Sequence, residues 1–232
     1  MAELTLVGSS HVARDSIKGI KKVILEKKPN IVAIELDQQR LQALFKRSKG
    51  SVKLSSIRKI GLMGFIFTVI GKLLQEKLGK VVGIAPGSDM KSAVLAAKKI
   101  NATVFLIDKN IVEISRDIST KLTFFEKIKI ILYIVGGLIY TPFMTIFKKP
   151  KKGVDISKVP PKEMVKELVG EFKKRFPRLY EILITDRNKH MAASLNFLVN
   201  QNKNNKIVAV VGAGHISGIK DILKNKYSIK VK

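Results

Sequence analysis

Two short runs in this sequence are apolar at almost every position, residues 31–36 (IVAIEL) and 207–211 (IVAVV). Strands that are apolar on both faces are typical of a parallel sheet covered by helices on either side. Residues 4–7 and 103–107 are further strand patterns, and helical patterns separate the runs at both ends of the chain. The sequence therefore predicts an α/β fold with a mainly parallel central sheet flanked by helices.

The middle of the chain departs from this alternation of strands and helices. Apolar residues make up 46% of the 232 residues, which is enough for the packed core of one large domain. We expect a single domain over residues 1–232, with long helical insertions at about 52–80 and 123–202. No solenoid-type repeat and no long low-complexity linker divides it.

Residues 130–147 form an uncharged run with lysines on both sides. Its length is at the lower limit for a membrane span, and Gly136, Gly137 and Pro142 interrupt it. Three interpretations stay open: a buried or dimer-forming helix, a helix that lies against a membrane surface, or a span. The first of these predicts a homodimer through residues 123–147.

The charge balance is strongly basic, with 44 Lys and Arg against 18 Asp and Glu and a net charge of +26. A Lys-rich solvated surface would explain this, and so would an anionic membrane surface as a partner. Nucleic acid is the less favoured partner, because Trp is absent and no basic run alternates with stacking aromatics.

Two features bear on the compartment. Cysteine is absent, which excludes disulfides and thiolate metal sites and fits a reducing environment. Glu3 follows the start, and the apolar run at residues 4–7 is too short for a signal peptide. We therefore expect a protein in the cytoplasm or on the cytoplasmic face of a membrane.

Two segments share a pattern in which an apolar strand runs into Gly-x-x-His: LTLVGSSHVARDSI near the start and IVAVVGAGHISGI near the end. Gly8 and Gly212 permit a sharp turn, and His11 and His215 follow. If the two strands are parallel and close together, both imidazoles emerge at the carboxyl edge of the sheet. Open α/β sheets usually bind ligands at that edge.

Glu35 ends an otherwise apolar strand, and a carboxylate there needs a partner or a shifted pKa. Two histidines and a carboxylate can hold a divalent metal such as Mn, Co or Zn, which activates a bound water. His11, His215 and Glu35 are therefore candidate metal ligands, with Glu35 alternatively the general base of a hydrolase. Two simpler interpretations stay open: each His packs or caps a helix, or Glu35 pairs with Arg116 or Arg187.

Two polar clusters, IDKNIVEISRDI and ITDRNKHMA, carry Arg116 and Arg187. Their guanidinium groups are candidates for binding an anionic group of the substrate or a developing oxyanion, with buried ion pairs as the alternative. Ser10, Arg40 and Asn188 are predicted to contact the substrate. No GK[ST] phosphate loop, HExxH motif or G-x-S-x-G elbow occurs in the sequence.

Six ordered motifs resemble those of the TraB/PrgY pheromone-shutdown family, and they extend from residue 4 to about residue 223. GSSHVARDS resembles the family's G-T-x-H-V-S-x-x-S, IELDQQR its V-E-L-D-x-x-R, and IDKNIVEISRDI its D-R-x-I-x-x-T-x-x-R; PGSDM, TDRNKHMA and VVGAGHISGI complete the set. Ser9, Asp89 and Lys109 stand where the family usually has Thr, Glu and Arg.

The TraB family is grouped with the Tiki, erythromycin-esterase-like and ChaN-like proteins. Tiki members are metal-dependent proteases whose site includes two G-x-x-H motifs and an acidic residue. The resemblance therefore implies a metal site at His11, Glu35 and His215, with Arg116 and Arg187 as site arginines. It implies a metal-dependent hydrolase, of the peptidase kind, that acts on peptides near a membrane. The alternatives are a non-catalytic peptide- or pheromone-binding regulatory domain and an adaptor that binds through its charge.

Overall fold

The structure is a computed structural model that describes residues 3–9, 14–46, 54–82, 85, 87–133, 136, 162–201, 204, 206–224 and 229–231. Its five strands are β1 (Glu3–Ser9), β2 (Ile31–Ile34), β3 (Thr103–Leu106), β4 (Lys206–Gly212) and β5 (Ile229–Val231). They form one sheet in the order β3-β2-β4-β1-β5, and every neighbouring pair is parallel. The predicted α/β fold with a parallel central sheet is confirmed.

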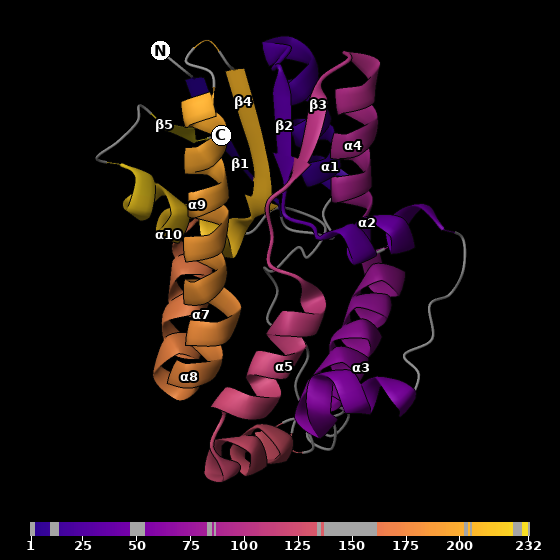
Figure 1. Cartoon of the computed structure of the whole chain (residues 1–232), viewed down its shortest axis with the longest axis vertical. Coiled ribbons are helices and arrows are strands. Elements are labelled where there is room, and N and C mark those ends of the chain that lie inside the picture. Colours follow the sequence, from indigo (N-terminus) through magenta and orange to yellow (C-terminus); the bar gives the residue numbers. More distant parts are fainter. Residues whose placement is uncertain are drawn as a thin grey trace, which may run out of the picture.

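Helices make up most of the remaining described chain. They are α1 (Arg14–Lys27), α2 (Gln38–Phe45), α3 (Ile57–Val82), α4 (Ser88–Lys99), α5 (Ile111–Lys121), α7 (Lys162–Arg175), α8 (Pro177–Tyr180), α9 (Asp186–Gln201) and α10 (Ala213–Leu223). A 3-10 turn (Leu54–Ser56) precedes α3, a π-helix (Glu181–Thr185) precedes α9, and residues 124–133 are also helical. In Figure 1, α3, α5, α7 and α8 lie beyond the carboxyl ends of the strands.

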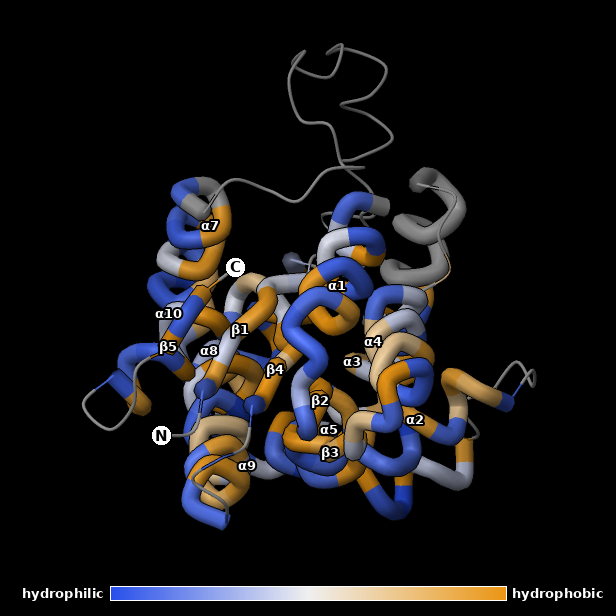
Figure 2. Tube along the Cα trace, turned by 90° about the horizontal axis from the view of Figure 1, so that it is seen from above, coloured by the Kyte–Doolittle hydropathy of each residue, from blue (hydrophilic) through white to orange (hydrophobic). Residues whose placement is uncertain are grey.

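Helices cover both faces of the sheet, as Figure 2 shows from above. The strands are therefore apolar on both faces. Alternate residues of a strand point to opposite faces. Val32, Val208 and the strand residues that point to the same face pack with α1 and α4 in one core cluster. Ile31, Ile207 and the strand residues that point to the opposite face pack with α9 and α10 in a second core cluster. The strands formed by the two apolar runs, β2 and β4, are therefore neighbours inside the sheet.

The helical layer beyond the carboxyl edge has a core of its own. Met63 of α3, Ile114 and Ile118 of α5, and Ile182 before α9 belong to this third cluster. At Gly64 the backbone of α3 comes so close to the carbonyl oxygen of Ser115 that a Cβ would overlap it. The helical middle of the predicted fold is thus present where the chain is described, while the single domain and the insertion bounds 52–80 and 123–202 stay a prediction.

The apolar middle of the chain is described only in part. Most of residues 130–147 lies outside the described residues, and so do most of the contacts that would test the predicted homodimer. Within the described chain, the stretch Leu54–Leu73 is long and apolar enough to cross a membrane, with a mean hydropathy of 1.4 and 17% of it buried. Core helices of soluble proteins meet the same length and composition criteria.

Candidate functional site

β1 and β4 are adjacent parallel strands that end at the same level, with Ser9 opposite Gly212. The chain leaves β1 for α1 on one face of the sheet and leaves β4 for α10 on the other. Such a point, where the connections diverge, opens a crevice that commonly binds ligands. The prediction that the two Gly-x-x-His segments leave neighbouring strands is confirmed, although Ser10 and His11 themselves lie outside the described residues.

Glu35 directly follows β2, the strand that pairs with β4 on the side opposite β1. Its backbone N–H donates to the carbonyl oxygen of Val210 over 3.0 Å, which continues the pairing of the two strands by one residue. The carboxylate is only 4% exposed, and its Oε2 accepts from the backbone N–H of Gly212. Because Gly212 is the N-cap of α10, the positive end of that helix faces the carboxylate. Glu35 is thereby fixed against the second Gly-x-x-His turn.

His215 lies in the first turn of α10 and is buried. Its Nδ1 is 2.7 Å from Oδ1 of Asn188, and its Nε2 is 3.4 Å from Oε1 of Glu35. An amide oxygen accepts hydrogen bonds only, so Nδ1 carries the proton in this orientation. Nε2 faces the carboxylate of Glu35: the two groups form an ion pair when the imidazole is protonated, and they are two acceptors when it is neutral.

Asn188 reaches His215 because Gly218 has no side chain. A Cβ at Gly218 would overlap the amide nitrogen of Asn188. Asn188 is itself buried in α9, one residue after Arg187. Asn188, packed against Gly218, therefore fixes the orientation of the His215 imidazole from the side that faces away from Glu35.

Arg187 links Glu35 to a second buried carboxylate, Asp108, which follows β3 by two residues. Arg187 Nε donates to Oδ1 of Asp108 over 3.0 Å, and Nη2 donates to Oδ2 over 2.7 Å. Nη2 also donates to Glu35, and Nη1 donates to the carbonyl oxygen of Leu183 over 3.2 Å. Each of the three guanidinium nitrogens thus has an acceptor, as the buried-ion-pair alternative predicted.

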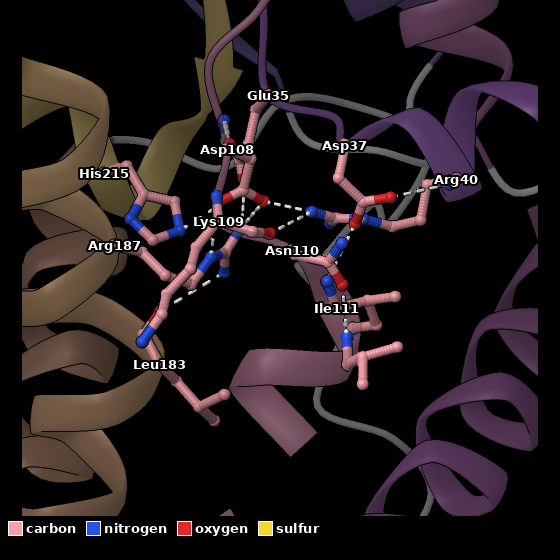
Figure 3. Close-up of polar contacts among 12 residues, drawn as sticks. Glu35, Asp37, Arg40, Asp108, Lys109, Asn110, Ile111, Leu183, Arg187 and His215 are labelled. Carbon is pink, nitrogen blue, oxygen red and sulfur yellow. Dashed lines mark hydrogen bonds and ion pairs between the residues drawn. The ribbon is translucent and has the colours of Figure 1, made fainter. Parts of the chain in front are cut away.

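Arg40 approaches Asp108 from the opposite side, as Figure 3 shows. It also donates to Asp37 over 2.8 Å and to the carbonyl oxygen of Lys109 over 3.2 Å. Asp37 in turn accepts from the backbone N–H of Arg40 in α2 and from that of Ile111 in α5, both over 2.9 Å. The network therefore ties the edge of the sheet to the first turns of two helices.

The charges of this network shift the pKa values of its members. Burial raises the pKa of Asp108, but the hydrogen bonds and positive charges of Arg187 and Arg40 outweigh it and lower the pKa to about 2. Burial lowers the pKa of Arg187, but the charges and hydrogen bonds of Glu35 and Asp108 raise it further above its ordinary value. Asp108 and Arg187 are therefore fixed charges at neutral pH.

The structure brings some of the predicted site residues together and leaves Arg116 apart from them. Glu35, Arg187, Asn188 and His215 come together, and Arg40 joins them through Asp108. Arg116 donates to the carbonyl oxygen of Lys59 over 3.3 Å and makes no hydrogen bond to the described residues of this cluster.

Asp108 belongs to the polar cluster IDKNIVEISRDI, but the sequence analysis did not select it as a site residue. It is a carboxylate two residues beyond the apolar strand β3, as Glu35 is one residue beyond β2, and that signal would have found it. The backbone N–H of Gly212 carries no sequence signal of its own, because its role depends on which strand lies beside it.

The fold and this edge define the class of protein: a parallel α/β domain with a polar, charged site at the point where its strand connections diverge. Within the described part of the chain, no three His, Asp or Glu side chains form a group that would hold a metal ion. Glu35 and His215 supply two of the three predicted ligands, and His11 is the third.

The chain belongs to the TraB/PrgY/gumN family, whose sequence profile matches residues 2–227. It is 34% identical over 228 residues to an uncharacterised protein of Methanocaldococcus jannaschii, which covers 96% of this chain and 53% of that protein. TraB domain-containing proteins of Mus musculus and Homo sapiens are 24% and 23% identical over 238 residues, which cover 92% of this chain and 61% of each relative. The family resemblance of the motifs is confirmed, and the chain spans roughly half to three-fifths of these relatives.

Proposed function

We propose that this domain is a metal-dependent hydrolase of the peptidase kind, with the metal at His11, His215 and Glu35. One observation carries the proposal: Nε2 of His215 lies 3.4 Å from Oε1 of Glu35. Two acceptors that face each other repel unless a proton or a metal ion lies between or beside them. A proton on Nε2 or a metal ion removes this repulsion, and the family motifs favour the metal because they add His11 as a third ligand.

The distance between the two atoms suits a shared ion. With metal–nitrogen and metal–oxygen distances of roughly 2.0–2.2 Å, two ligands of a tetrahedral Zn site lie about 3.4 Å apart. His215 Nε2 and Glu35 Oε1 have this separation before any ion is added. Mn and Co bind similar nitrogen and oxygen ligands, so all three metals are candidates.

The surroundings of the two ligands resemble the second layer of a metal site. Metal-binding histidines usually donate their other N–H to an acceptor, as His215 does to Asn188. Metal-binding carboxylates are usually hydrogen-bonded as well, as Glu35 is to Gly212 and Arg187. Both ligands are thus oriented by partners that leave His215 Nε2 directed at Glu35.

A bound divalent ion supplies an activated water near neutral pH. Glu35 is placed either to bind the ion or to accept a proton from that water, because its carboxylate is held beside His215. Arg187 balances the negative charges of Glu35 and Asp108. Four hydrogen bonds to Asp108, Glu35 and Leu183 use four of its five N–H donors, so its contacts support a role in holding Glu35.

The substrate class rests on the family motifs, which favour a peptide near a membrane. Two exposed aromatic side chains support the membrane part of this proposal, Phe124 (70% exposed) and Phe125 (82% exposed). Lys127 and Lys129 lie on the same helical segment, and the whole chain carries a net charge of +26. Exposed aromatics among lysines suit the surface of an anionic membrane.

Elemental analysis of the purified protein tests the proposal. We expect about one equivalent of Mn, Co or Zn after reconstitution, and loss of that metal in the double variant His11→Ala/His215→Ala. His190→Ala is the matched control, because His190 is an exposed residue of α9. A wild-type protein that takes up none of the three metals, or a double variant that keeps its metal, would overturn the site.

Peptide cleavage in the presence of each metal tests the reaction. We expect turnover that a chelator abolishes and that the double variant lacks. Peptide binding with no cleavage under any of the three metals would instead support the non-catalytic regulatory domain.

A further inference from the structure

β3 is an edge strand of the sheet, and part of its main chain faces outward. It comes first in the strand order, so the described residues add no further strand beyond it. The N–H groups of Thr103 and Ile107 donate over 2.9 and 3.0 Å to the residue before β2 and to the last residue of β2. Alternate residues of a parallel strand direct their N–H and C=O groups to the same side, so those of Val104 and Leu106 point away from β2.

One face of β3 is uncovered as well. Thr103 and Phe105 pair in register with Ile31 and Ala33 of β2, which are buried in the core cluster of α9 and α10. Thr103 and Phe105 are themselves exposed, and the exposed fraction of Phe105 is 38%. The helices that cover β2 on this face therefore leave the side chains of β3 accessible.

β3 has none of the features that commonly protect an edge strand from pairing with another chain. Such strands usually contain charged residues, proline or a bulge. The sequence of β3 is TVFL, and its register with β2 is continuous from Thr103 to Leu106. The edge therefore offers main-chain donors and acceptors, which is the chemistry that an extended peptide matches when it adds a strand to a sheet.

The charges beside this edge are basic. α4 lies beside β3 in Figure 1 and packs on the face opposite Phe105. Its exposed charged residues are Lys91, Lys98 and Lys99, whereas its one acidic residue, Asp89, is 1% exposed. Alternate side chains of a strand face opposite sides. A strand paired with β3 would thus direct one set of side chains toward these lysines and the other set toward Phe105.

Charge also distinguishes between the chains that would pair with this edge. Two copies of the protein each carry a net charge of +26 and repel one another. A strand of four residues supplies few hydrogen bonds to offset that repulsion. An acidic peptide is attracted by the same charge.

We propose that the edge of β3 is the docking site of an extended peptide segment in which acidic and apolar residues alternate. The inference goes beyond the proposed function, because pairing of main-chain groups needs no metal ion. β3 leads to Asp108, which Arg187 joins to Glu35, so the docking edge ends on the same side of the sheet as the candidate site.

Hydrogen exchange of single amides, followed by NMR, tests the pairing. In the free protein we expect the N–H groups of Val104 and Leu106 to exchange faster than those of Phe105 and Ile107, which face β2. A peptide of alternating Glu and Val, at about ten times its Kd, should slow the exchange of Val104 and Leu106 by about 10-fold. The amides that face β2 are the internal controls.

Val104→Pro removes one outward N–H. Proline is tolerated in an edge strand where the missing N–H would face solvent. We expect the labelled peptide to bind about 5- to 10-fold more weakly by fluorescence anisotropy, because one main-chain hydrogen bond is lost. Val104→Ala is the matched control, since it shortens the same side chain and keeps the N–H.

Lys98→Glu/Lys99→Glu tests the preference for acidic side chains. We expect this double variant to bind the Glu–Val peptide several-fold more weakly and a Lys–Val peptide more tightly. Lys173→Glu/Lys174→Glu is the matched control, because it makes the same change in net charge on exposed residues of α7.

These measurements are made with a chelator present, so their result does not depend on whether the protein binds a metal. If circular dichroism shows that Val104→Pro does not fold, the exchange experiment and the charge reversal carry the test. Three results would overturn the inference: slow exchange of Val104 and Leu106 in the free protein at every concentration, protection that rises with protein concentration alone, or peptide binding that leaves both amides unchanged. The second of these would identify another copy of the chain as the occupant.

Discussion

At the scale of single residues, acidic and basic side chains alternate through the site. Asp108 lies between Arg187 and Arg40, and Arg187 lies between Asp108 and Glu35. Removing one member of such a buried pair leaves its partner's charge without compensation, which is more costly than the pair was stabilising. The network therefore has measurable consequences for stability as well as for the position of Glu35.

Asp108→Asn tests the network through its dependence on pH. The pKa of Asp108 is lowered from 3.8 to about 2 in the folded protein, so the ionised form is favoured by folding. Its contribution, about 2 kcal/mol, is fully present above pH 4 and is lost as the pH falls toward 2. We expect Asp108→Asn to be less stable at pH 7 and to show a smaller loss of stability between pH 4 and pH 2.

Urea unfolding at several pH values measures both effects. Asp15→Asn is the control, because Asp15 is exposed in the first turn of α1. An acid dependence in Asp108→Asn as steep as in the wild type would show that another carboxylate dominates.

Gly218→Ala tests how Asn188 orients His215. A Cβ at this position overlaps the amide of Asn188 and should displace it from His215 Nδ1. We expect a loss of about 1–3 kcal/mol in stability from overpacking and a 10- to 100-fold loss in metal affinity. Chemical denaturation and metal titration measure the two effects.

Gly19→Ala is the matched control for this substitution. No atom lies within 4 Å of the place where its Cβ would be, and α1 should gain about 0.5–1 kcal/mol from the better helix former. Equal metal affinity in Gly218→Ala and the wild type would contradict the orienting role of Asn188.

Some of this residue-level detail was within reach of the sequence. Glu35 stood out because a single carboxylate ended an apolar strand, and Arg187 was one of two partners considered for it. The role of Asn188 as the partner of His215 was not predicted, because it depends on the packing of α9 against α10. Local patterns show which residues are unusual, and only the tertiary arrangement shows which of them meet.

At the scale of elements, the first turns of helices carry much of the site. α9 begins directly after the π-helix Glu181–Thr185, in which the N–H of Asp186 bonds to the carbonyl of Glu181. The extra residue in this turn sets the direction in which Arg187 and Asn188 leave the helix. Strands were predictable from their apolar runs, whereas a π-turn has no comparable sequence pattern.

The contact between α3 and α5 gives a test at this scale. Gly64→Ala would push the backbone of α3 away from Ser115, so we expect a loss of about 1–3 kcal/mol in stability. Gly71→Ala on the same helix is the control, because nothing lies within 4 Å of its Cβ position.

Thermal and urea unfolding of the two variants measure this contact, and metal affinity should stay unchanged in both because the contact lies in the separate helical core. Equal stability of the two variants would mean that α3 and α5 move apart without cost.

At the scale of the whole molecule, charge and exposed apolar surface occur together. The net charge is +26, and Phe124 and Phe125 are exposed beside lysines. The sequence predicted the charge-driven partners but not which aromatic side chains would be exposed, since that depends on how residues 124–133 pack. The membrane partner remains a proposal that vesicle binding can test.

We expect the protein to sediment with vesicles that contain phosphatidylserine and to be released as the salt concentration rises. Phe124→Ser/Phe125→Ser should weaken this binding several-fold, because the apolar contact is lost while the charge is kept. Phe197→Ser on α9 is the control for an exposed phenylalanine elsewhere. Binding that is insensitive to both salt and the double substitution would contradict a membrane surface as the partner.

Anomalous diffraction from crystals soaked in zinc, manganese or cobalt tests the central claim most directly. We predict an anomalous peak within about 2.0–2.2 Å of both His215 Nε2 and Glu35 Oε1, with His11 completing the coordination. A crystal at neutral pH with no peak at these two atoms, and with His215 still 3.4 Å from Glu35, would contradict the metal site.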